Sequence, residues 1–253
     1  MRLDQAVAAR FPNLSRRKAR ELIAQKRVLV NERPVGVASR EVSDGDRIAI
    51  VAELPELRVI AKSDDWIAVD KPVGMPTQPP RDRRTRSLEE LLRVAYGEIY
   101  LVHRLDTPTS GVVLFARNRA AAARLSELFA SGAMRKTYVA VVAGVIDREI
   151  TIDSPIDRKE ALTIVRPLEC GGTAAAFVDD PKAAALHSKI AVEIRTGRTH
   201  QIRIHLASIG HPVLGDVRYG GSPAPRLMLH AWKLEHESIG SLVAPPPDGF
   251  GAL

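Results

Sequence analysis

The chain has 253 residues, and its 37 lysines and arginines outnumber 30 aspartates and glutamates to give a formal net charge of +7. A hydrophobic content of 45% is typical of a globular protein. The single cysteine, Cys170, excludes an internal disulfide framework and a multi-cysteine metal cluster. The longest apolar run, residues 138–146, is too short to cross a bilayer, and residues 1–4 lack the apolar stretch of a secretory signal. We therefore expect a soluble, cytoplasmic protein that is monomeric and makes no membrane contact.

The positive charge is concentrated near the amino terminus. Residues 1–50 carry 11 basic and 6 acidic side chains, whereas the other 203 residues carry 26 and 24. Four arginines form a second basic cluster at residues 81–86. Segregated positive charge is typical of a protein that binds a polyanion, although a single basic run is often only a solvated surface. With 4% aromatic residues, base stacking is not expected to dominate such binding.

The first fifty residues are predicted to fold as a small α+β unit. Apolar residues at 3, 7 and 11 indicate one helix, and Ser15 is a suitable N-cap for a second helix that buries residues 19, 22 and 23. Strands are expected at 28–30 and near 48–50, with a turn at 31–34. This layout resembles an S4-type RNA-binding domain, here spanning residues 1–52, with residues 52–56 as the linker. The candidate RNA-binding side chains are Arg16, Arg17, Lys18, Arg20, Lys26 and Arg27.

Residues 57–253 alternate between strand and helix patterns. Strands are predicted at 66–69, 111–116 and 137–142, and Ser87 with Glu90 forms a capping box for a helix. Residues 137–142 are apolar on both faces, which predicts a central strand. Residues 190–194 alternate, as in a half-buried strand. We expect an α+β fold with a mixed or mainly antiparallel central sheet and flanking helices.

The most informative stretch is His103-Arg104-Leu105-Asp106-Thr107-Pro108-Thr109-Ser110-Gly111. It is a polar loop between two apolar segments, where a scaffold can present reactive groups. In an extended backbone, Arg104 and Asp106 point to the same side. On spacing alone, a local ion pair between these two residues followed by a turn is the simpler interpretation.

A second stretch, residues 195–206, contains three arginines and two histidines. Residues 202, 206 and 209 predict a helix that stops near Gly210. Arg203 lies at the edge of its buried stripe and must find a carboxylate, because an unpaired buried charge costs several kcal/mol. His205 is expected to be a hydrogen-bonded core residue. His200, His205, His211 and Asp216 have spacings that match no familiar set of metal ligands, so no metal is expected.

The chain resembles the RluA-type RNA pseudouridine synthases over nearly its whole length. The resemblance rests on Lys71-Pro72-Val73-Gly74, the HRLDTPTSG block at 103–111 and Arg135-Lys136-Thr137-Tyr138. It continues through RTGRTHQIRIHLASIGHPVLGD at 195–216 to Tyr219-Gly220-Gly221. It implies a pseudouridine synthase catalytic domain at residues 57–253 that isomerises specific uridines in structured RNA without a cofactor.

The resemblance also implies roles for individual residues. Asp106 corresponds to the catalytic aspartate, Tyr138 to the active-site tyrosine and Arg203 to the basic residue paired with the aspartate. Whether the aspartate attacks C1′ of the ribose or removes the C2′ proton stays open. Without the resemblance, Tyr138 is equally well read as a core tyrosine. We expect Arg104 to hold the position vacated by an extruded nucleotide, with His103 and Thr109 as further substrate contacts.

Other interpretations predict different behaviour. A non-enzymatic RNA-binding protein would need only residues 1–55, a metal-dependent hydrolase would use the carboxy-terminal histidines, and a nucleoside hydrolase fits the segregated charge poorly. One departure from the family pattern lies at residues 171–177, which weakens the substrate assignment more than the chemistry. Ribosomal RNA of the large subunit is favoured over transfer RNA because an S4-type domain accompanies the catalytic one.

Overall fold

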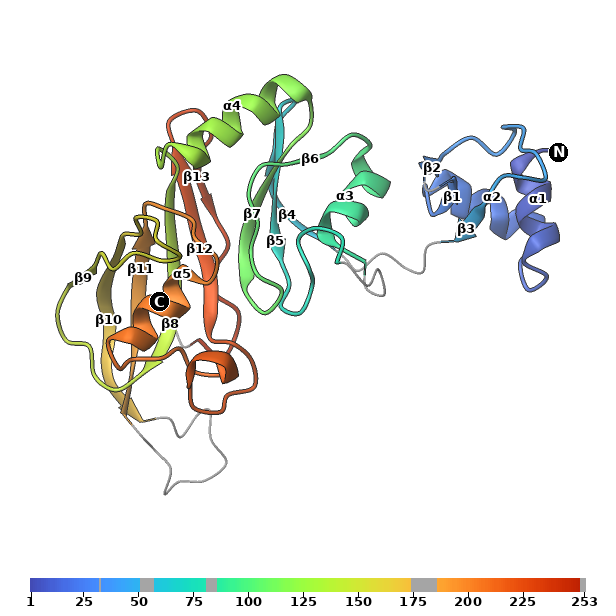
Figure 1. Ribbon diagram of the computed structural model, residues 1–253. Helices are drawn as coiled ribbons and strands as arrows, with labels where there is room; N and C mark the ends of the chain where they lie inside the picture. The colour runs from blue at the N-terminus through green and yellow to red at the C-terminus, as the bar shows by residue number, and fades with distance from the viewer. Residues whose placement is uncertain (32, 51–56, 81–85, 174–185, 251–253) are drawn as a thin grey trace.

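The computed structural model describes residues 1–31, 33–50, 57–80, 86–173 and 186–250, which form two sheets with separate hydrophobic cores. In Figure 1 the first fifty residues form a small body of their own beside a larger one. None of the described helices is long and apolar enough to cross a membrane. The expected end of the first domain at residue 52 falls within residues 51–56, outside the described part of the chain, and the described residues resume at 57. The domain boundaries stay predictions.

The amino-terminal unit contains the helices α1 (Leu3–Arg10) and α2 (Arg16–Ala24) and the strands β1 (Val28–Val30), β2 (Arg33–Val35) and β3 (Ile48–Ile50). The strands are antiparallel in the order β2-β1-β3. The expected N-cap is confirmed, because the Ser15 side chain accepts a hydrogen bond from the Lys18 amide. The predicted turn at 31–34 is too long, because Pro34 already lies in β2; an edge strand tolerates a proline that cannot donate to the ladder.

The larger unit is built on a ten-stranded sheet. Its main path runs β4 (Arg58–Lys62), β5 (Trp66–Lys71), β7 (Ser110–Ala116), β12 (Leu229–His236), β8 (Arg135–Ala143), β11 (Leu186–Ile194), β10 (Thr163–Thr173) and β9 (Ile150–Ile152). The short strand β6 (Tyr100–Leu101) pairs with β7, and β13 (Gly240–Val243) pairs with β12. All these pairs are antiparallel except β7 with β12, so the predicted mixed, mainly antiparallel sheet is confirmed.

The parallel pairing of β7 with β12 lies at the sheet's centre and depends on a glycine. Gly111 has φ +114°, and a Cβ there would collide with the backbone of Ala231. The close approach joins the strand that follows the 103–111 loop to β12, which also pairs with β8. The loop is therefore anchored to the middle of the sheet rather than to an edge.

Helices α3 (Leu88–Tyr96), α4 (Arg119–Ala130) and α5 (Gln201–Ser208) accompany the sheet in Figure 1. A 3₁₀ segment, η3 (Val217–Tyr219), follows α5 in the chain. The predicted capping box of Ser87 and Glu90 at the start of α3 is confirmed. Helix α5 ends two residues before Gly210, whose φ of +82° suits the predicted stop. His205 is a core histidine, as expected: its two ring nitrogens contact Thr163 Oγ1 and the Ser154 carbonyl, each at 2.9 Å.

Strand β8 is central and buried, as predicted, whereas β11 differs from the expectation of a half-buried strand. Its polar residues Ser188, Lys189 and Glu193 are at most 3% exposed. They are tolerated because each has a polar partner: the Ser188 hydroxyl accepts a hydrogen bond from the Ile146 amide, and Lys189 and Glu193 form ion pairs. The departure at 171–177 begins at the end of β10, and residues 174–177 lie outside the described residues.

Candidate active site

Asp106 lies in a loop whose backbone is fixed on both sides. Thr77 Oγ1 donates to the Leu105 carbonyl at 2.7 Å and accepts from the Leu105 amide at 3.2 Å. On the other side, the Thr109 amide donates to the Asp106 carbonyl at 3.0 Å. The Asp106 side chain itself stays 24% exposed. The loop therefore presents one carboxylate on a backbone that cannot readily shift.

A buried lysine braces the same loop from behind. Lys71 is fully buried, and its Nζ donates to the carbonyls of Pro72, Met75 and Thr107 at 3.1, 2.7 and 3.2 Å. Burial, with a contribution from nearby Arg226, lowers the pKa of Lys71 to about 8, while Asp106 opposes the shift. The lysine of the Lys71-Pro72-Val73-Gly74 block thus ties the segment after β5 to the Asp106 loop.

The Asp106 side chain opens into a cavity of about 400 Å³, a volume suited to a small organic group. Side chains from the 103–111 loop, β8 and the start of α5 meet here, although they are far apart in the sequence. Five of the six catalytic and substrate-binding candidates line it: Arg104, Asp106, Thr109, Tyr138 and Arg203. It is completed by Leu105, Ile194, Gly197, Arg198, Thr199, His200, Gln201, Ile202 and Leu229.

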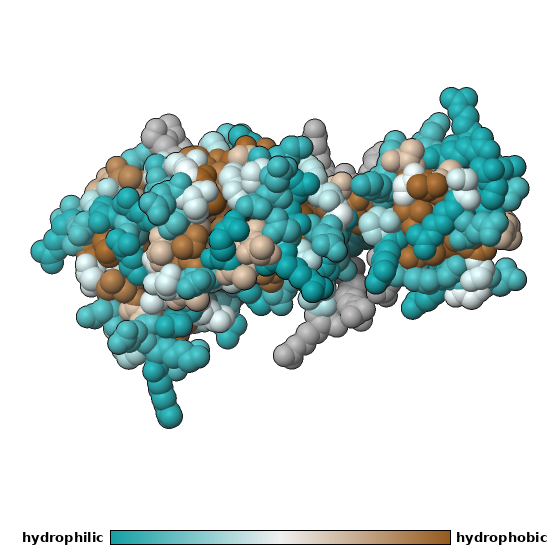
Figure 2. All heavy atoms as spheres, turned by 90° about the horizontal axis from the view of Figure 1, so that it is seen from above, coloured by the Kyte–Doolittle hydropathy of each residue, from teal (hydrophilic) through white to brown (hydrophobic). Residues whose placement is uncertain are grey.

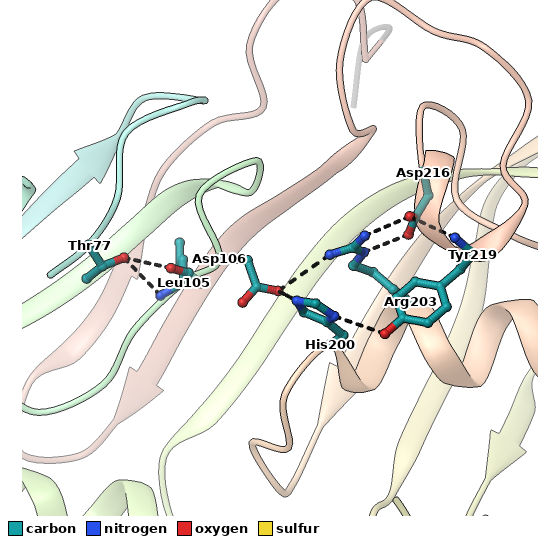
Figure 3. A network of polar contacts seen from close by, with 7 residues as sticks. All are labelled: Thr77, Leu105, Asp106, His200, Arg203, Asp216 and Tyr219. Carbon is teal, nitrogen blue, oxygen red and sulfur yellow. Dashed lines mark hydrogen bonds and ion pairs between the residues drawn. The ribbon is translucent and has the colours of Figure 1, made fainter. Parts of the chain in front are cut away.

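Arg203 has a stronger partner than the one expected from the sequence. Its Nε and Nη2 bind Asp216 Oδ2 and Oδ1 at 2.6 and 2.7 Å, whereas Nη1 lies 3.9 Å from Asp106 Oδ2. Figure 3 shows the guanidinium between the two carboxylates. The hydrogen bonds to Asp216 hold the pKa of Arg203 above its usual value. The pairing with Asp106 is present but secondary, because Asp216 determines where the guanidinium lies.

Asp216 is the main partner of Arg203, although from the sequence it was considered only as a possible metal ligand. It is 1% exposed and also caps η3 by accepting from the Tyr219 amide at 3.3 Å. A signal for it existed: a buried arginine needs a carboxylate, and the block at 195–216 that contains Arg203 ends in Asp216. Choosing Asp106 alone overlooked this second acid within the same stretch.

His200 and Tyr219 complete the polar network around Asp106 (Figure 3). His200 Nε2 lies 3.6 Å from Asp106 Oδ2, and its Nδ1 lies 2.9 Å from the Tyr219 hydroxyl. Burial lowers the pKa of His200; the Arg203 and Arg218 charges lower it further, whereas Asp106 raises it. The contacts thus run from Tyr219 to His200, from His200 to Asp106 and from Asp106 to Arg203, which Asp216 binds on its other side.

Tyr138 projects from β8 into the cavity and is 9% exposed. Burial, reinforced by the Asp106 charge, raises the pKa of its hydroxyl. The phenol is therefore neutral at physiological pH. It can pack against a ring and can donate or accept a hydrogen bond, but it is not present as a phenolate.

His103 lies apart from the cavity. Its ring stacks on Phe129 with centroids 4.1 Å apart, and its Nε2 accepts a hydrogen bond from the Leu114 amide at 2.9 Å. Burial, with the neighbouring Lys136 charge, lowers the pKa of His103 to about 3, so the ring is neutral. These contacts assign His103 to packing between the loop and α4 and do not support the expected substrate contact. Arg104, by contrast, is exposed and lines the cavity.

Basic residues of the amino-terminal unit are organised by a buried acid that the sequence did not single out. Asp4 is fully buried and receives Arg20, Arg16 and Arg2 at 2.9, 3.1 and 3.4 Å. Although burial raises it, hydrogen bonds from Arg20 and Arg16 lower the pKa of Asp4 to about 2. Hydrophilic residues cover most of this unit in Figure 2, where it lies at the right.

Two of the remaining predicted RNA contacts, Arg17 and Lys18, share a partially exposed acid. Glu21 lies 3.1 Å from Lys18 and 3.5 Å from Arg17, and the Arg17 side chain stays 91% exposed. Lys26 is exposed, and Arg27 is half-buried. The second basic cluster, at 81–86, lies outside the described residues except for exposed Arg86.

Comparison with known proteins agrees with this geometry. The chain matches an RNA pseudouridylate synthase family model over residues 65–208 and an S4 domain model over residues 1–48. It is 33% identical to the ribosomal large subunit pseudouridine synthase D of Escherichia coli O6:H1, over 88% of this chain and 74% of that protein. The protein of the same name from Haemophilus influenzae is 30% identical over 100% of this chain and 90% of its own length.

Solved structures show the same fold. Human RNA Pseudouridylate Synthase Domain Containing 1 superposes with a TM-score of 0.63 and 28% identity, covering 78% of this chain and 85% of that chain. Human RNA Pseudouridylate Synthase Domain Containing 4 gives a TM-score of 0.59 at 21% identity, covering 76% and 90%. The interpretation as a non-enzymatic RNA-binding protein is therefore set aside. The chain belongs to the RNA pseudouridylate synthase family, a family of isomerases, and carries an S4 domain at residues 1–48.

Proposed function

We propose that this enzyme converts specific uridines of large-subunit ribosomal RNA to pseudouridine, with Asp106 acting at the ribose. The choice of RNA is supported by the curated relatives, which are named ribosomal large subunit pseudouridine synthases and match 88–100% of the chain. Transfer RNA is the alternative substrate. A cytoplasmic, monomeric enzyme remains our expectation from the sequence.

The observation that carries the chemistry is a carboxylate, Asp106, facing a cavity beside a guanidinium and a neutral phenol. Breaking the N1–C1′ bond of uridine develops positive charge on the ribose, which an ionised carboxylate can stabilise or trap. Arg203 brings a positive charge to within 3.9 Å of Asp106 Oδ2, where it can attract a carboxylate. Both routes, attack at C1′ and removal of the C2′ proton, need this ionised carboxylate.

The detached uracil must stay in the cavity while it turns and joins C1′ through C5. Tyr138 is suited to pack against the ring, and its neutral hydroxyl can reach a proton that leaves C5. The reaction is redox-neutral, and its atoms balance: the C5 hydrogen is lost to solvent and N1 gains a proton. Leu105, Ile194 and Leu229 give the cavity apolar wall surface against which the uracil ring can pack.

A uridine in folded RNA must leave its base stack before it can enter the cavity. Arg104 is exposed at the cavity and is suited to occupy the vacated position, while Thr109 is a further contact inside it. The S4 domain supplies salt-sensitive docking through its arginines and lysines.

The experiment that tests this function is the mapping of pseudouridines in total RNA from cells with and without the gene. The proposal predicts that one or a few pseudouridines disappear from large-subunit ribosomal RNA and return with the wild-type gene. Loss of sites in transfer RNA alone would replace the proposed substrate. An unchanged map would overturn the proposed function.

A further inference from the structure

The backbone at His200 is held in a conformation that few side chains adopt. His200 has φ 55° and ψ 22°, in the left-handed region, at the N-cap position of α5. Its side chain makes no capping hydrogen bond to that helix. A residue with a Cβ occupies this region only at a cost in free energy, so other contacts must hold it there. Strained positions of this kind are frequent where a side chain has a functional direction.

The ring of His200 is fixed between two groups. Its Nδ1 lies 2.9 Å from the Tyr219 hydroxyl, and its Nε2 points at Asp106 Oδ2, 3.6 Å away (Figure 3). The two rings meet edge to face at 79°, with centroids 5.7 Å apart. Tyr219 is itself held, because its amide binds Asp216 and its ring lies 5.0 Å below the Arg203 guanidinium. The histidine therefore links the network behind Arg203 to the candidate catalytic carboxylate.

The contacts select one form of the ring. The charged groups that face His200 are Asp106, Asp216, Arg203 and Arg218, and burial with the two arginines outweighs the acids to lower its pKa. A neutral imidazole carries one N–H. A bare nitrogen lone pair that faced the Asp106 carboxylate would be repelled by it, so electrostatics favour the proton on Nε2. Nδ1 then accepts, and the Tyr219 hydroxyl is its donor.

We propose that His200, with its tautomer fixed by Tyr219, is a positioning residue that directs an N–H at Asp106 Oδ2 and leaves Oδ1 free to face the ribose. The separation of 3.6 Å exceeds a hydrogen bond, and it closes when a bound nucleotide displaces water from the cavity. His200 does not touch the reacting atoms and acts through Asp106. The inference rests on the assignment of Asp106 to the pseudouridine reaction.

Two substitutions at position 200 separate a role in positioning Asp106 from a role limited to the local structure. The amide nitrogen of glutamine can reach the place of Nε2, so His200→Gln keeps a donor for Asp106. The shorter asparagine reaches only the place of Nδ1, so His200→Asn loses the donor. Asparagine nevertheless tolerates the left-handed backbone better than glutamine. A role limited to the left-handed backbone therefore favours the asparagine variant, and a positioning role favours the glutamine variant.

The assay is release of tritium from [5-³H]uridine in a transcript of large-subunit ribosomal RNA, followed in a single turnover. We expect His200→Asn to slow the step about tenfold or more at unchanged RNA affinity, and His200→Gln to stay within about threefold of wild type. An asparagine variant as fast as the glutamine variant would overturn the proposal. His236→Gln is the matched control, because His236 is a half-buried histidine outside the cavity lining, and its Nδ1 contacts Ser238. No release by the wild-type enzyme would count against the substrate instead.

A second measurement does not depend on activity. In the wild-type enzyme labelled with ¹⁵N-histidine, NMR should show His200 protonated at Nε2 and bare at Nδ1, and Tyr219→Phe should mix the two tautomers. Tyr100→Phe, which removes a hydroxyl that donates to Glu98 at 2.9 Å, should leave the His200 signals unchanged. Protonation at Nδ1 in the wild type would contradict the proposal even if every variant folded poorly.

Discussion

Asp4 in the amino-terminal unit and Asp216 in the catalytic unit are both buried carboxylates that bind arginine, but they leave their arginines in different places. The arginines around Asp4 have side chains 49–55% exposed, whereas the Arg203 side chain held by Asp216 is 8% exposed. Asp4 gathers several positive charges at a surface, where they can meet phosphates. Asp216 fixes a single guanidinium inside a cavity, where it can act on one carboxylate.

The difference follows from solvent. Burial strengthens the attraction between the two charges of an ion pair. Loss of one partner then destabilises the fold strongly, because the other charge is left buried and unpaired. Arginines that reach water are screened and can exchange their acid for another anion. The same pairing therefore serves orientation at Asp216 and display at Asp4, and the two centres should respond differently to mutation, pH and salt.

Removing the acid of the buried centre should have the largest effect. Asp216→Ala leaves Arg203 charged and without its bidentate partner, and we expect the free energy of unfolding to fall by about 3–5 kcal/mol. Pseudouridine formation should fall with it. Urea unfolding monitors the change, with exposed Asp153→Ala as the matched control. A loss below about 1 kcal/mol would show that the pair does not hold Arg203 as described.

The Asp4 centre should reveal itself through pH. Its pKa is lowered from 3.8 to about 2, so its stabilisation is fully present above pH 4 and disappears as the pH falls through 2. Asp4→Asn should cost about 1–3 kcal/mol at neutral pH and remove that acid dependence. Hydrogen exchange of the amides in residues 1–50 of the full chain reports it, and Asp44→Asn, at an exposed acid, is the control. An identical acid dependence in Asp4→Asn would refute the assignment.

Arg104 offers a third case, an exposed arginine for which the described residues provide no carboxylate within ion-pair distance. If it holds the place of an extruded nucleotide, Arg104→Ala should slow turnover on folded RNA about tenfold. Turnover on an unstructured oligonucleotide with the same uridine should be unchanged, because no stack has to be opened. Equal slowing on both RNAs would assign Arg104 to the chemistry instead.

The smallest effect is expected at the periphery of the basic surface. Replacing both Arg17 and Lys18 by alanine should weaken RNA binding severalfold and reduce the slope of log affinity against log salt by about 1–2. Filter binding at several salt concentrations measures both. Exposed Arg148→Ala, in the catalytic unit, should leave the slope unchanged. If the double variant keeps the wild-type slope of log affinity against log salt, the result would argue against docking of RNA through α2.

Much of the fold could be predicted from the sequence because local signals agree with tertiary contacts. The capping residues Ser15 and Ser87, the central strand β8 and the stop near Gly210 all follow from short-range patterns. Strand β11 could not be predicted as buried, because its polar residues depend on partners from other strands. Pro34 was wrongly assigned to a turn for a similar reason, since only the strand order shows that β2 is an edge strand that tolerates a proline.

The candidate site was predicted in its residues more fully than in its contacts. Motif resemblance brought Asp106, Tyr138 and Arg203 together, and they do line one cavity. The main partner of Arg203 was missed because the sequence shows which residues carry charge, but it does not show which of two acids, Asp106 or Asp216, lies nearer to the guanidinium. The expected substrate contact of His103 is not supported: its adjacency to Arg104 suggested a shared task, but adjacent residues point to opposite sides of an extended chain.

The central claim is that the Asp106 carboxylate carries out the reaction. The most direct measurement is single-turnover tritium release from a large-subunit ribosomal RNA transcript by Asp106→Asn, a nearly isosteric change that removes only the charge. We predict a rate lower by a factor of about 10³ or more, with RNA affinity and melting temperature close to wild type. A rate within about tenfold of wild type would contradict the account.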